Sequence, residues 1–301
     1  MMNYLNKVKY SNKILITGSK GQLGSTIIHH EEARSFEMIA LSHRELDISN
    51  PSSIHHAITT YHPNILINTA AYTQVDQAEK EKDLAAKTND HGARHLAAAC
   101  KKFKIPLLHF STDYIFDGLK SSPYLEEDAV NPLNVYGQTK YAGECAIREE
   151  WEQHLILRIS GVFSEYGSNF LKTILHLSTE KKSFSVVADQ ITCPTYTKDI
   201  ADAIFTILKQ KLIWGTYHYC STPPLSWYEF ANAILHEAKQ YQDFLVEEIE
   251  TTSKEKYKTL ASRPPYSAFN CDKIKKTFGV EQASSQKAIK QVLAQLYEKK
   301  L

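Results

Sequence analysis

The sequence has few cysteines, and the five it has are scattered among 301 residues without any C-x-x-C pair. They are Cys100, Cys145, Cys193, Cys220 and Cys271. An odd number at irregular spacing argues against a disulfide framework, and the lack of close pairs argues against a zinc site. We therefore expect a reduced protein whose cysteines carry no structural cross-links.

Long apolar runs and an excess of charge of either sign are also missing. No stretch approaches the roughly 18 consecutive apolar residues that a membrane-spanning helix needs. The first residues, MMNYLNKVKYSNK, are polar and lack the apolar run of a signal peptide. The net charge of +1 offers no basic surplus for nucleic acid or for an anionic membrane. We expect a cytoplasmic protein that binds neither.

The N-terminal half alternates short apolar runs with helix-like stretches. The runs are nearly continuous in Ile, Leu and Val and cover residues 13–17, 37–42, 64–70, 106–112 and 154–160. Strands of this kind, separated by helices, indicate a parallel sheet that is covered on both faces. The sequence therefore predicts an α/β protein with a Rossmann-type doubly wound parallel sheet. Within it, Asn50 and Pro51 are typical of a helix start.

After about residue 165 the alternation loosens, and five prolines follow at 194, 223, 224, 264 and 265. Further helices are predicted over 168–180, 197–210, 226–241 and 284–299. We expect an NAD(P)-binding domain over residues 1–165 and a smaller, mainly substrate-binding domain over residues 166–301. Some of the later elements are expected to return to the first domain.

A glycine-rich turn follows the first predicted strand directly and opens a helix. In ILITGSKGQLGSTII the glycines are Gly18, Gly21 and Gly24. Without Cβ atoms the turn can be tight, and a pyrophosphate can approach the backbone and the helix N-terminus. The G-x-x-G-x-x-G spacing indicates a short-chain or extended short-chain reductase.

The end of the second strand bears on the choice of dinucleotide. An NAD-specific enzyme would place an acidic residue just past this strand, but Ser42, His43 and Arg44 come first here. Ser42 and Arg44 can instead accept a 2′-phosphate, which favours NADPH, with NADH as an alternative. Asp47 lies either under the adenine edge or in a turn before the next helix.

Two segments supply side chains for hydride-transfer chemistry. In STDYIFDG, Ser111 and Thr112 end a buried strand, and that end of a doubly wound sheet faces the ligand. In NVYGQTKYAGE, Tyr136 and Lys140 share one face of the following helix. Hydride delivery to a ketone creates an alkoxide that needs a proton. Tyr136 can supply it if the Lys140 ammonium lowers the phenol pKa, while Thr112 hydrogen-bonds the substrate oxygen.

Seven segments in order resemble the dTDP-4-dehydrorhamnose reductase family of extended short-chain reductases, from about residue 13 to 297. They are TGSKGQLG, LDISNP, INTAAYTQVDQAE, STDYIFDG, NVYGQTKYAGE, DQITCPT and RPPYSAFN. The resemblance implies reduction of the 4-keto group of a dTDP-linked 6-deoxy sugar with NADPH or NADH, for surface polysaccharide.

The same resemblance assigns residues. It implies the catalytic set Thr112, Tyr136 and Lys140. For the cofactor it adds Gln22, Leu23, Ala70, Ala71, Tyr72 and Thr73 to the glycines, Ser111 and the residues after the second strand. Tyr136 and Lys140 are also expected to contact the cofactor, with Lys140 holding the nicotinamide ribose. For the substrate it implies Thr112, Asp113, Asn169, Gln190 and Arg263. It leaves the oligomeric state open, a homodimer being one alternative.

One position departs from the family pattern. The family commonly has a Trp near the sugar after the strand HLILRIS, where this chain has Gly161. A missing aromatic reshapes the pocket, so the substrate can be dTDP-4-dehydrorhamnose or a related 4-keto sugar.

Three rival functions share the scaffold. Dehydratases typically place an Asp-Glu pair after the strand-end Thr, whereas here Asp113 is followed by Tyr114. A nucleotide-sugar epimerase would keep its NAD bound throughout the cycle. A non-catalytic NADP-binding subunit, such as the regulatory subunit of methionine adenosyltransferase, would bind another protein.

No metal site is predicted. The pairs His29–His30 and His55–His56 are adjacent residues that point in different directions on a helix, so neither pair is a chelate. Some family members use Mg²⁺ between subunits, but no residue of this sequence secures such a site.

Overall fold

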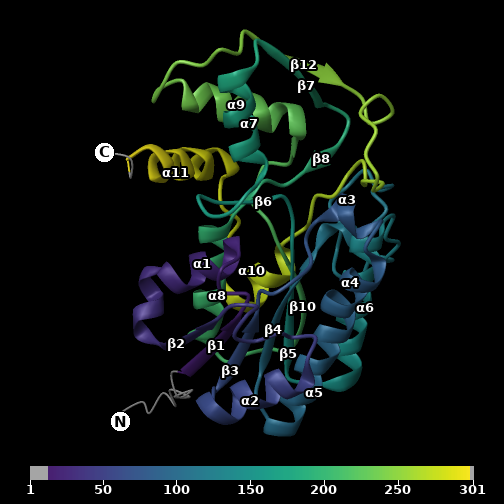
Figure 1. The fold of residues 1–301 in the computed structure, drawn as a ribbon, viewed down its shortest axis with the longest axis vertical. Coiled ribbons are helices and arrows are strands. Elements are labelled where there is room, and N and C mark those ends of the chain that lie inside the picture. Colours follow the sequence, from purple (N-terminus) through teal and green to yellow (C-terminus); the bar gives the residue numbers. More distant parts are fainter. Residues whose placement is uncertain (1–12, 299–301) are drawn as a thin grey trace.

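A six-stranded parallel sheet forms the centre of the molecule, in the order β2-β1-β3-β4-β5-β10 (Figure 1). The computed structural model describes residues 13–298. The strands are β1 (Lys13–Thr17), β2 (Glu37–Leu41), β3 (Ile65–Asn68), β4 (Leu107–Thr112), β5 (His154–Ile159) and β10 (Gly215–Tyr219). Every residue of β3 and β4 is buried, as expected for strands covered on both faces. The predicted doubly wound sheet is confirmed.

Helices cover the two faces of this sheet. One face holds α2 (Pro51–Tyr61), α5 (Gly92–Phe103) and α6 (Val135–Glu150), which pack against the side of the strands that carries Leu15 and Leu66. The other holds α1 (Gln22–His29), α8 (Thr197–Leu208) and α10 (Asp272–Phe278), against Ile16 and Ile67. Short helical turns connect these elements: η1 (Glu31–Ser35), α3 (Val75–Ala78), α4 (Lys82–Ala86), η2 (Lys87–His91) and η3 (Asp113–Ile115).

Local signals in the sequence account for several helix starts. The Asn50 side chain accepts hydrogen bonds from the backbone amides of Ser52 and Ser53, and Pro51 opens α2, as predicted. α9 (Trp227–Ala238) starts with a capping box in which Ser226 and Glu229 satisfy each other's backbone amides. Within residues 13–298, every helix is too short or too polar to cross a bilayer.

A second group of elements has its own apolar core, and we call it the small lobe. It consists of α7 (Phe170–Glu180), β7 (Ser183–Val187), α9, β12 (Glu248–Thr252) and α11 (Ser285–Glu298), packed around Phe163, Phe230 and Ile289. Two short strand pairs adjoin it, β6 (Val162–Phe163) with β9 (Thr195–Tyr196) and β8 (Ile191–Thr192) with β11 (Leu225–Ser226). α7, α8, α9 and α11 match the predicted later helices; the predicted end of the last one, residue 299, lies outside the described residues.

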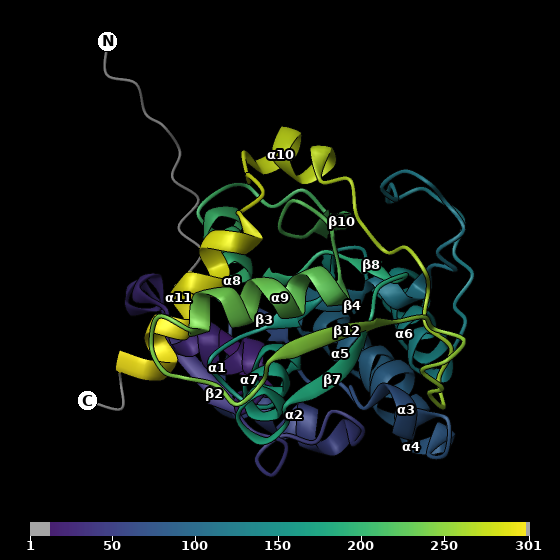
Figure 2. The same cartoon turned by 90° about the horizontal axis from the view of Figure 1, so that it is seen from above.

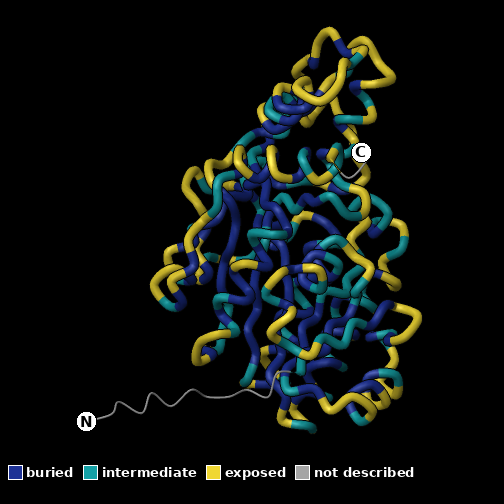
Figure 3. Tube along the Cα trace, turned by 90° about the vertical axis from the view of Figure 1, so that its left-hand side faces the viewer, coloured by how far each residue is buried: buried dark blue, intermediate teal, exposed yellow. Residues whose placement is uncertain are grey.

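The small lobe lies over one end of the sheet (Figures 1 and 2). Between its segments the chain returns to the sheet as α8, β10 and α10. Buried residues follow the central strands, while exposed residues mark the outer loops and the far tip of the small lobe (Figure 3). The domain boundary near residue 165 stays a prediction.

The strand order fixes where a ligand can enter. From β1 the chain moves to β2 on one side, and the next strand, β3, pairs on the other side of β1. At such a switch point the loops after neighbouring strands diverge and leave a crevice at the carboxyl ends of the strands. The glycine turn follows β1, so it lies at this crevice.

Candidate active site

Gly18 and Gly24, at the turn between β1 and α1, have no room for a side chain. Gly18 has a φ of +67°, and a Cβ there would lie 2.7 Å from the backbone nitrogen of Ala70. A Cβ on Gly24 would lie 2.5 Å from the Gly18 carbonyl oxygen. α1 starts after Gly21, which has no side chain to cap the helix. The first amides of α1 are thereby left for an anion, which fits the pyrophosphate of a dinucleotide.

The end of β4 and the start of α6 hold the predicted catalytic residues. Thr112 is the last residue of β4, and Tyr136 and Lys140 lie in the first two turns of α6. Asn134 caps α6 by accepting a hydrogen bond from the Gly137 amide at 2.8 Å. The chain therefore presents both segments at the same end of the sheet.

One cavity of about 440 Å³ joins these side chains to the glycine turn. From the predicted set it is lined by Gly21, Gln22, Leu23, Ala71, Thr73, Ser111, Thr112, Asp113, Tyr136, Lys140 and Asn169. These residues come from segments that are far apart in the sequence. The structure thus brings the predicted phosphate turn and the predicted catalytic residues into one space.

The Tyr136 side chain is partly buried in this cavity, and the loss of solvent around the phenol raises its pKa above the ordinary tyrosine value. The Thr112 hydroxyl partly opposes this shift, and the negative charge of Asp113 adds to it. The expected lowering of the phenol pKa by Lys140 is therefore not what the structure shows. At neutral pH Tyr136 holds its proton, as an acid must before it donates.

Lys140 turns toward β4 instead. Its Nζ donates a hydrogen bond of 2.6 Å to the Phe110 carbonyl and lies 3.3 Å from His109 Nε2. Burial lowers the pKa of Lys140 to about 8, although the Glu144 carboxylate acts in the opposite direction. The lysine is therefore close to its titration point near neutral pH.

Thr112 is fixed by its neighbours. Its hydroxyl donates to Asp113 Oδ1 at 3.1 Å and accepts from the Tyr114 amide at 3.2 Å. Asp113 is buried, which raises its carboxyl pKa, while hydrogen bonds from Ser267 and Ser160 hold it down. The Thr112 oxygen is therefore presented to the cavity in a set orientation.

The residues predicted for the adenosine side lie outside the lining of this cavity. Ser42 donates from its hydroxyl and its amide to Glu45 Oε2, at 2.6 and 2.8 Å. Sequence reasoning missed that Glu45 folds back on this strand end. Asp47 accepts from the amide and hydroxyl of Ser49, which fits the alternative reading of it as a turn residue. Arg44 is exposed on the same loop.

Ala70 and Tyr72, two further predicted cofactor residues, also lie outside the cavity lining. Ala70 supports the glycine turn from behind, as its close approach to Gly18 shows. The Tyr72 hydroxyl donates to Glu81 at 2.8 Å, and its amide donates to Asn89 Oδ1 at 2.8 Å. Both residues therefore shape the walls around Ala71 and Thr73, which do line the cavity.

Asn169 links the small lobe to the glycine turn. Its side-chain amide donates to Gln22 Oε1 at 2.9 Å and to the Ser164 carbonyl at 2.7 Å. Its oxygen caps α7 by accepting from the Lys172 amide at 3.2 Å. A residue predicted for the substrate therefore contacts one predicted for the cofactor.

A second cavity of about 420 Å³ adjoins the first, and Tyr114, Phe170 and Trp227 line both. Gln190 and Arg263, the remaining predicted substrate residues, line this second cavity. Arg263 forms an ion pair with Asp76, with Nη2 and Oδ2 2.6 Å apart. Together the two cavities form an elongated site beneath the small lobe.

Known proteins match nearly the whole of this chain. The family model described as RmlD substrate binding domain matches residues 12–298. The chain is 41% identical over 293 residues to dTDP-4-dehydrorhamnose reductase of Aggregatibacter actinomycetemcomitans, which covers 94% of this chain and 98% of that protein. The chain belongs to the dTDP-4-dehydrorhamnose reductase family. The resemblance seen in the sequence is thereby confirmed.

One further sequence and one crystal structure are also similar to this chain over most of its length. Spore coat polysaccharide biosynthesis protein SpsK of Bacillus subtilis is 38% identical over 258 residues, covering 86% of this chain and 89% of that protein. The crystal structure of dTDP-4-dehydrorhamnose reductase from Bacillus anthracis in complex with NADP superimposes with a TM-score of 0.89 at 36% identity. It covers 95% of this chain and 99% of that one.

Gly161, where the dTDP-4-dehydrorhamnose reductase family commonly has a Trp, cannot simply be replaced by a larger residue. Its φ is +56°, and a Cβ would lie 2.6 Å from the Cys193 carbonyl oxygen. Aromatic surface comes from elsewhere, because Trp227 and Phe170 line the cavity with ring centroids 4.6 Å apart. Sequence reasoning missed both residues; the only signal was a Trp directly after the Ser226 cap.

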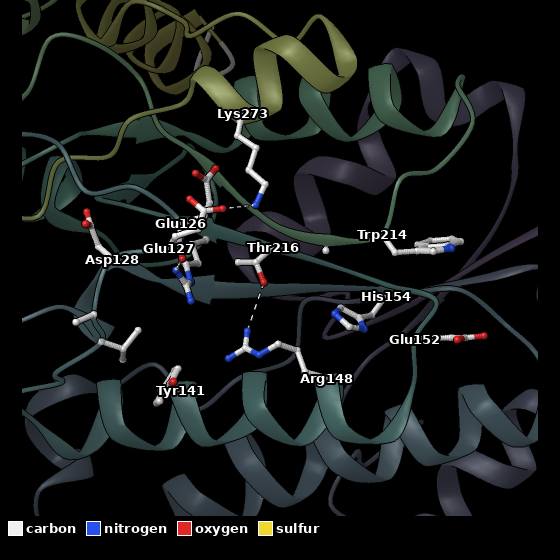
Figure 4. A pocket seen from close by; sticks show the side chains of 14 residues that line it. Glu126, Glu127, Asp128, Tyr141, Arg148, Glu152, His154, Trp214, Thr216 and Lys273 are labelled. Atoms are coloured by element: carbon white, nitrogen blue, oxygen red, sulfur yellow. Dashed lines mark hydrogen bonds and ion pairs between the residues drawn. The ribbon is translucent and has the colours of Figure 1, made fainter.

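A larger cavity of about 760 Å³ lies away from this family's candidate site, along the edge strand β10 (Figure 4). We call it the edge hollow, and it shares no lining residue with the candidate site. Two of its cationic side chains have partners within it: Lys273 donates to Glu127 at 2.8 Å, and Arg148 donates to the Thr216 hydroxyl at 3.3 Å. Size alone therefore does not identify the functional cavity.

The histidine pairs have ordinary structural contacts. His29 stacks on Tyr166, His30 lies 2.9 Å from Asp202, and His55 meets the edge of Phe103. Within residues 13–298, no group of three or more His, Cys, Asp or Glu side chains is arranged to hold a metal ion. The five cysteines are free thiols.

Proposed function

We propose that this chain reduces the 4-keto group of a dTDP-4-dehydro-6-deoxy sugar with NADPH. The substrate is dTDP-4-dehydrorhamnose or a close relative, and the product serves surface polysaccharide synthesis. One observation carries the proposal: a single cavity joins Thr112, Tyr136 and Lys140 to the uncapped start of α1. Full-length similarity to named dTDP-4-dehydrorhamnose reductases supports it.

The residues that would hold the cofactor follow from the cavity. The backbone of Gly21, Gln22 and Leu23 would bind the pyrophosphate, and Lys140 would hold the nicotinamide ribose. When bound, the nicotinamide supplies the hydride. Exposed Arg44 is available for a 2′-phosphate, and the NADP complex of the Bacillus anthracis relative supports NADPH over NADH.

The proton comes from the protein. Thr112 would turn its hydroxyl proton from Asp113 to the carbonyl oxygen of the substrate, and this hydrogen bond also stabilises the negative charge that develops there. Tyr136, kept protonated by burial, would donate its proton to that oxygen as the C4 carbon is reduced. The ketone thus gains one hydride and one proton and leaves as an alcohol.

The second cavity would take the nucleotide end of the substrate. Arg263 and Gln190 offer hydrogen-bond donors there, and Asn169 stands between this cavity and the glycine turn. A guanidinium binds a diphosphate with paired hydrogen bonds, although Arg263 must first exchange its contact with Asp76. The sugar would then lie against Trp227 and Phe170, next to Tyr136.

The decisive experiment is a panel of dTDP-linked keto sugars, each offered with NADPH and with NADH. We expect loss of the NADPH absorbance band with a dTDP-4-dehydro-6-deoxy sugar, and NMR of the product shows which C4 configuration forms. Purified protein that carries tightly held NAD and interconverts sugar epimers would instead indicate an epimerase. Absence of turnover with every sugar, together with a stable complex with another protein, would indicate a regulatory subunit.

We also propose that the chain works in the cytoplasm and that residues from about 166 onward supply most of the substrate contacts. The small lobe contributes Asn169, Phe170 and Trp227 to the cavity that holds Tyr136. A homodimer is compatible with this arrangement, since every residue proposed for the site comes from one chain. Sedimentation of the purified protein measures its oligomeric state directly.

A further inference from the structure

A row of buried polar side chains crosses the sheet beneath the candidate site. Thr17, Asn68 and His109 occupy directly paired positions on β1, β3 and β4. All three are buried, with at most 1% of their surface exposed. The Thr17 hydroxyl donates to Asn68 Oδ1 at 2.6 Å, and Asn68 Nδ2 lies 2.9 Å from His109 Nδ1. The row ends at Lys140, whose Nζ lies 3.3 Å from His109 Nε2.

The orientation of the Asn68 amide is determined by its surroundings. The Ala70 backbone N–H can only donate; it lies 3.2 Å from Asn68 Oδ1 and, more weakly, 3.4 Å from Thr17 Oγ1. Exchanging the oxygen and nitrogen of the Asn68 amide would set two donors against each other there. The Asn68 oxygen therefore faces Ala70 and Thr17, and its NH₂ group faces His109.

This orientation selects the tautomer of His109. An amide NH₂ has only hydrogens to offer, so His109 Nδ1 must accept and carries no proton. Burial, together with the positive charge of Lys140, lowers the pKa of His109 well below its ordinary value, so the ring is neutral. A neutral imidazole with a bare Nδ1 has its proton on Nε2. That N–H points at Lys140.

The contact between His109 and Lys140 distinguishes the two charge states of the lysine. An ammonium group has no lone pair, so it meets the Nε2–H of His109 as one donor facing another. A neutral amine accepts that N–H and still donates to the Phe110 carbonyl. We propose that His109, held by Asn68 as its Nε2–H tautomer, is a positioning residue that favours the uncharged amine of Lys140.

The other charges around Lys140 do not remove this effect. Glu144, one turn further along α6, favours the ammonium. Glu144 is already paired with Arg158 at 2.8 Å and with Arg148 at 3.0 Å, so most of its charge is compensated. Tyr136, one turn earlier on the helix, is neutral at working pH. Lys140 thus exchanges a proton with solvent near neutral pH rather than keeping it permanently.

The consequence for the reaction rests on the proposed reductase function. After Tyr136 gives its proton to the substrate oxygen, the phenolate must be protonated again. An ammonium that His109 already disfavours can pass its proton to that phenolate, directly or through the bound ribose, and become the amine that accepts from His109. The amine then takes a proton from solvent, so each turnover consumes one hydride and one solvent proton.

Nitrogen NMR of the histidine-labelled, ligand-free chain tests the tautomer without substrate or cofactor. The His109 signals are assigned by their absence in His109→Gln. We expect the Nε2–H tautomer across the whole pH range of the folded protein. In a second, lysine-labelled sample we expect the side-chain carbon signal of Lys140 to titrate close to pH 8. An Nδ1–H tautomer, or an imidazolium at neutral pH, overturns the proposal.

Asn68→Asp reverses the direction of the hydrogen bond between residue 68 and His109 Nδ1. A carboxylate only accepts, so it draws the His109 proton to Nδ1. Nε2 is then bare and accepts from the ammonium. We expect the Lys140 titration to move upward by about one pH unit or more, a tenfold change in the ratio of amine to ammonium. Thr17→Val is the matched control, since the Ala70 amide still orients Asn68 and the tautomer should stay unchanged. If the His109 tautomer changes in Asn68→Asp but the titration of Lys140 does not move, the proposal is wrong. If Asn68→Asp does not fold, the His109 tautomer in the wild-type protein decides between the proposal and its alternative.

The kinetic readout is the pH profile of kcat. Because the ammonium is the proton source, kcat should fall as the pH rises through about 8, and in Asn68→Asp this fall should move to higher pH. If the chain reduces no keto sugar, the proposed function fails while the NMR result on His109 still stands or falls separately.

Discussion

The edge hollow and the cavity that holds Tyr136 differ in kind, and we place the chemistry in the cavity that holds Tyr136. The edge hollow of about 760 Å³ is rich in charge, yet its lysine and its two arginines, Arg148 and Arg158, are bound to partners beside them. The cavity that holds Tyr136, about 440 Å³ and one of the two that form the candidate site, contains a phenol and an amine whose pKa values burial has moved in opposite directions. In the edge hollow, Lys273 and Glu127 pair with each other, whereas Tyr136 and Lys140, at the start of α6, face a cavity that can take a ligand.

The largest expected effect is at the phenol. Tyr136→Phe should lower kcat by about 10²–10⁴-fold, because it removes the proposed proton donor, while leaving NADPH affinity nearly unchanged. Tyr141→Phe is the matched control, since it removes a hydroxyl from the same helix on the side that faces the edge hollow. Steady-state kinetics of both variants measure the contrast. Equal activity in the two variants would show that the reaction does not depend on the cavity that holds Tyr136 any more than on the edge hollow.

The glycine turn gives the next largest contrast. Gly18→Ala must both adopt a φ of +67° and push its Cβ against the Ala70 backbone, so it should lose about 3 kcal/mol of stability or most of its NADPH affinity. Gly279→Ala has a similar φ of +69° but nothing within 4 Å, so it should lose only about 1 kcal/mol and keep its NADPH affinity. Urea unfolding and calorimetric titration with NADPH separate strain from crowding. Similar losses of stability and of NADPH affinity in both variants would show that the close approach of Gly18 to the Ala70 backbone does not contribute to either.

The aromatic wall should give an intermediate effect. Trp227→Ala removes a ring from both cavities of the site and should raise KM for the sugar nucleotide about tenfold, on the order of 1.4 kcal/mol, with less change in kcat. Trp214→Ala removes a ring that lines the edge hollow and should leave KM unchanged. An equal rise in KM for both would mean that the sugar does not rest on Trp227.

The smallest effect is expected in the edge hollow itself. Lys273→Ala breaks the ion pair with Glu127, in which both side chains are substantially exposed, so unfolding should change by less than about 1 kcal/mol. Turnover and KM should match the wild type. A clear loss of activity would assign the edge hollow a role in the reaction and undo the comparison.

The sequence predicted site residues best where their positions depend on a single strand end, turn or helix. Thr112, Tyr136 and Lys140 could be placed together because a strand end and the next helix of a doubly wound sheet meet at one edge. The glycine turn was readable because it lies between a strand and a helix. Neither inference needed long-range packing.

The missed features depend on distances across the fold. His109 joins Lys140 to Asn68 only through the register of β3 against β4, which no short motif specifies. Trp227 reaches the cavity from a helix that starts about 90 residues after Tyr136, once the small lobe is folded over the sheet. The direction of the Tyr136 pKa depends on how deeply the phenol is buried, and the spacing of Tyr136 and Lys140 carries no information about depth.

The chain's repeated passage between sheet and small lobe has a practical consequence. α8 and β10 return to the sheet after the first small-lobe segment, and α10 returns before α11. A polypeptide cut near residue 165 would lose the edge strand β10 and two covering helices along with the lobe. The two halves therefore cannot be exchanged between related enzymes at a single junction, and a chimera that swaps only the sugar-facing part would need several splice points.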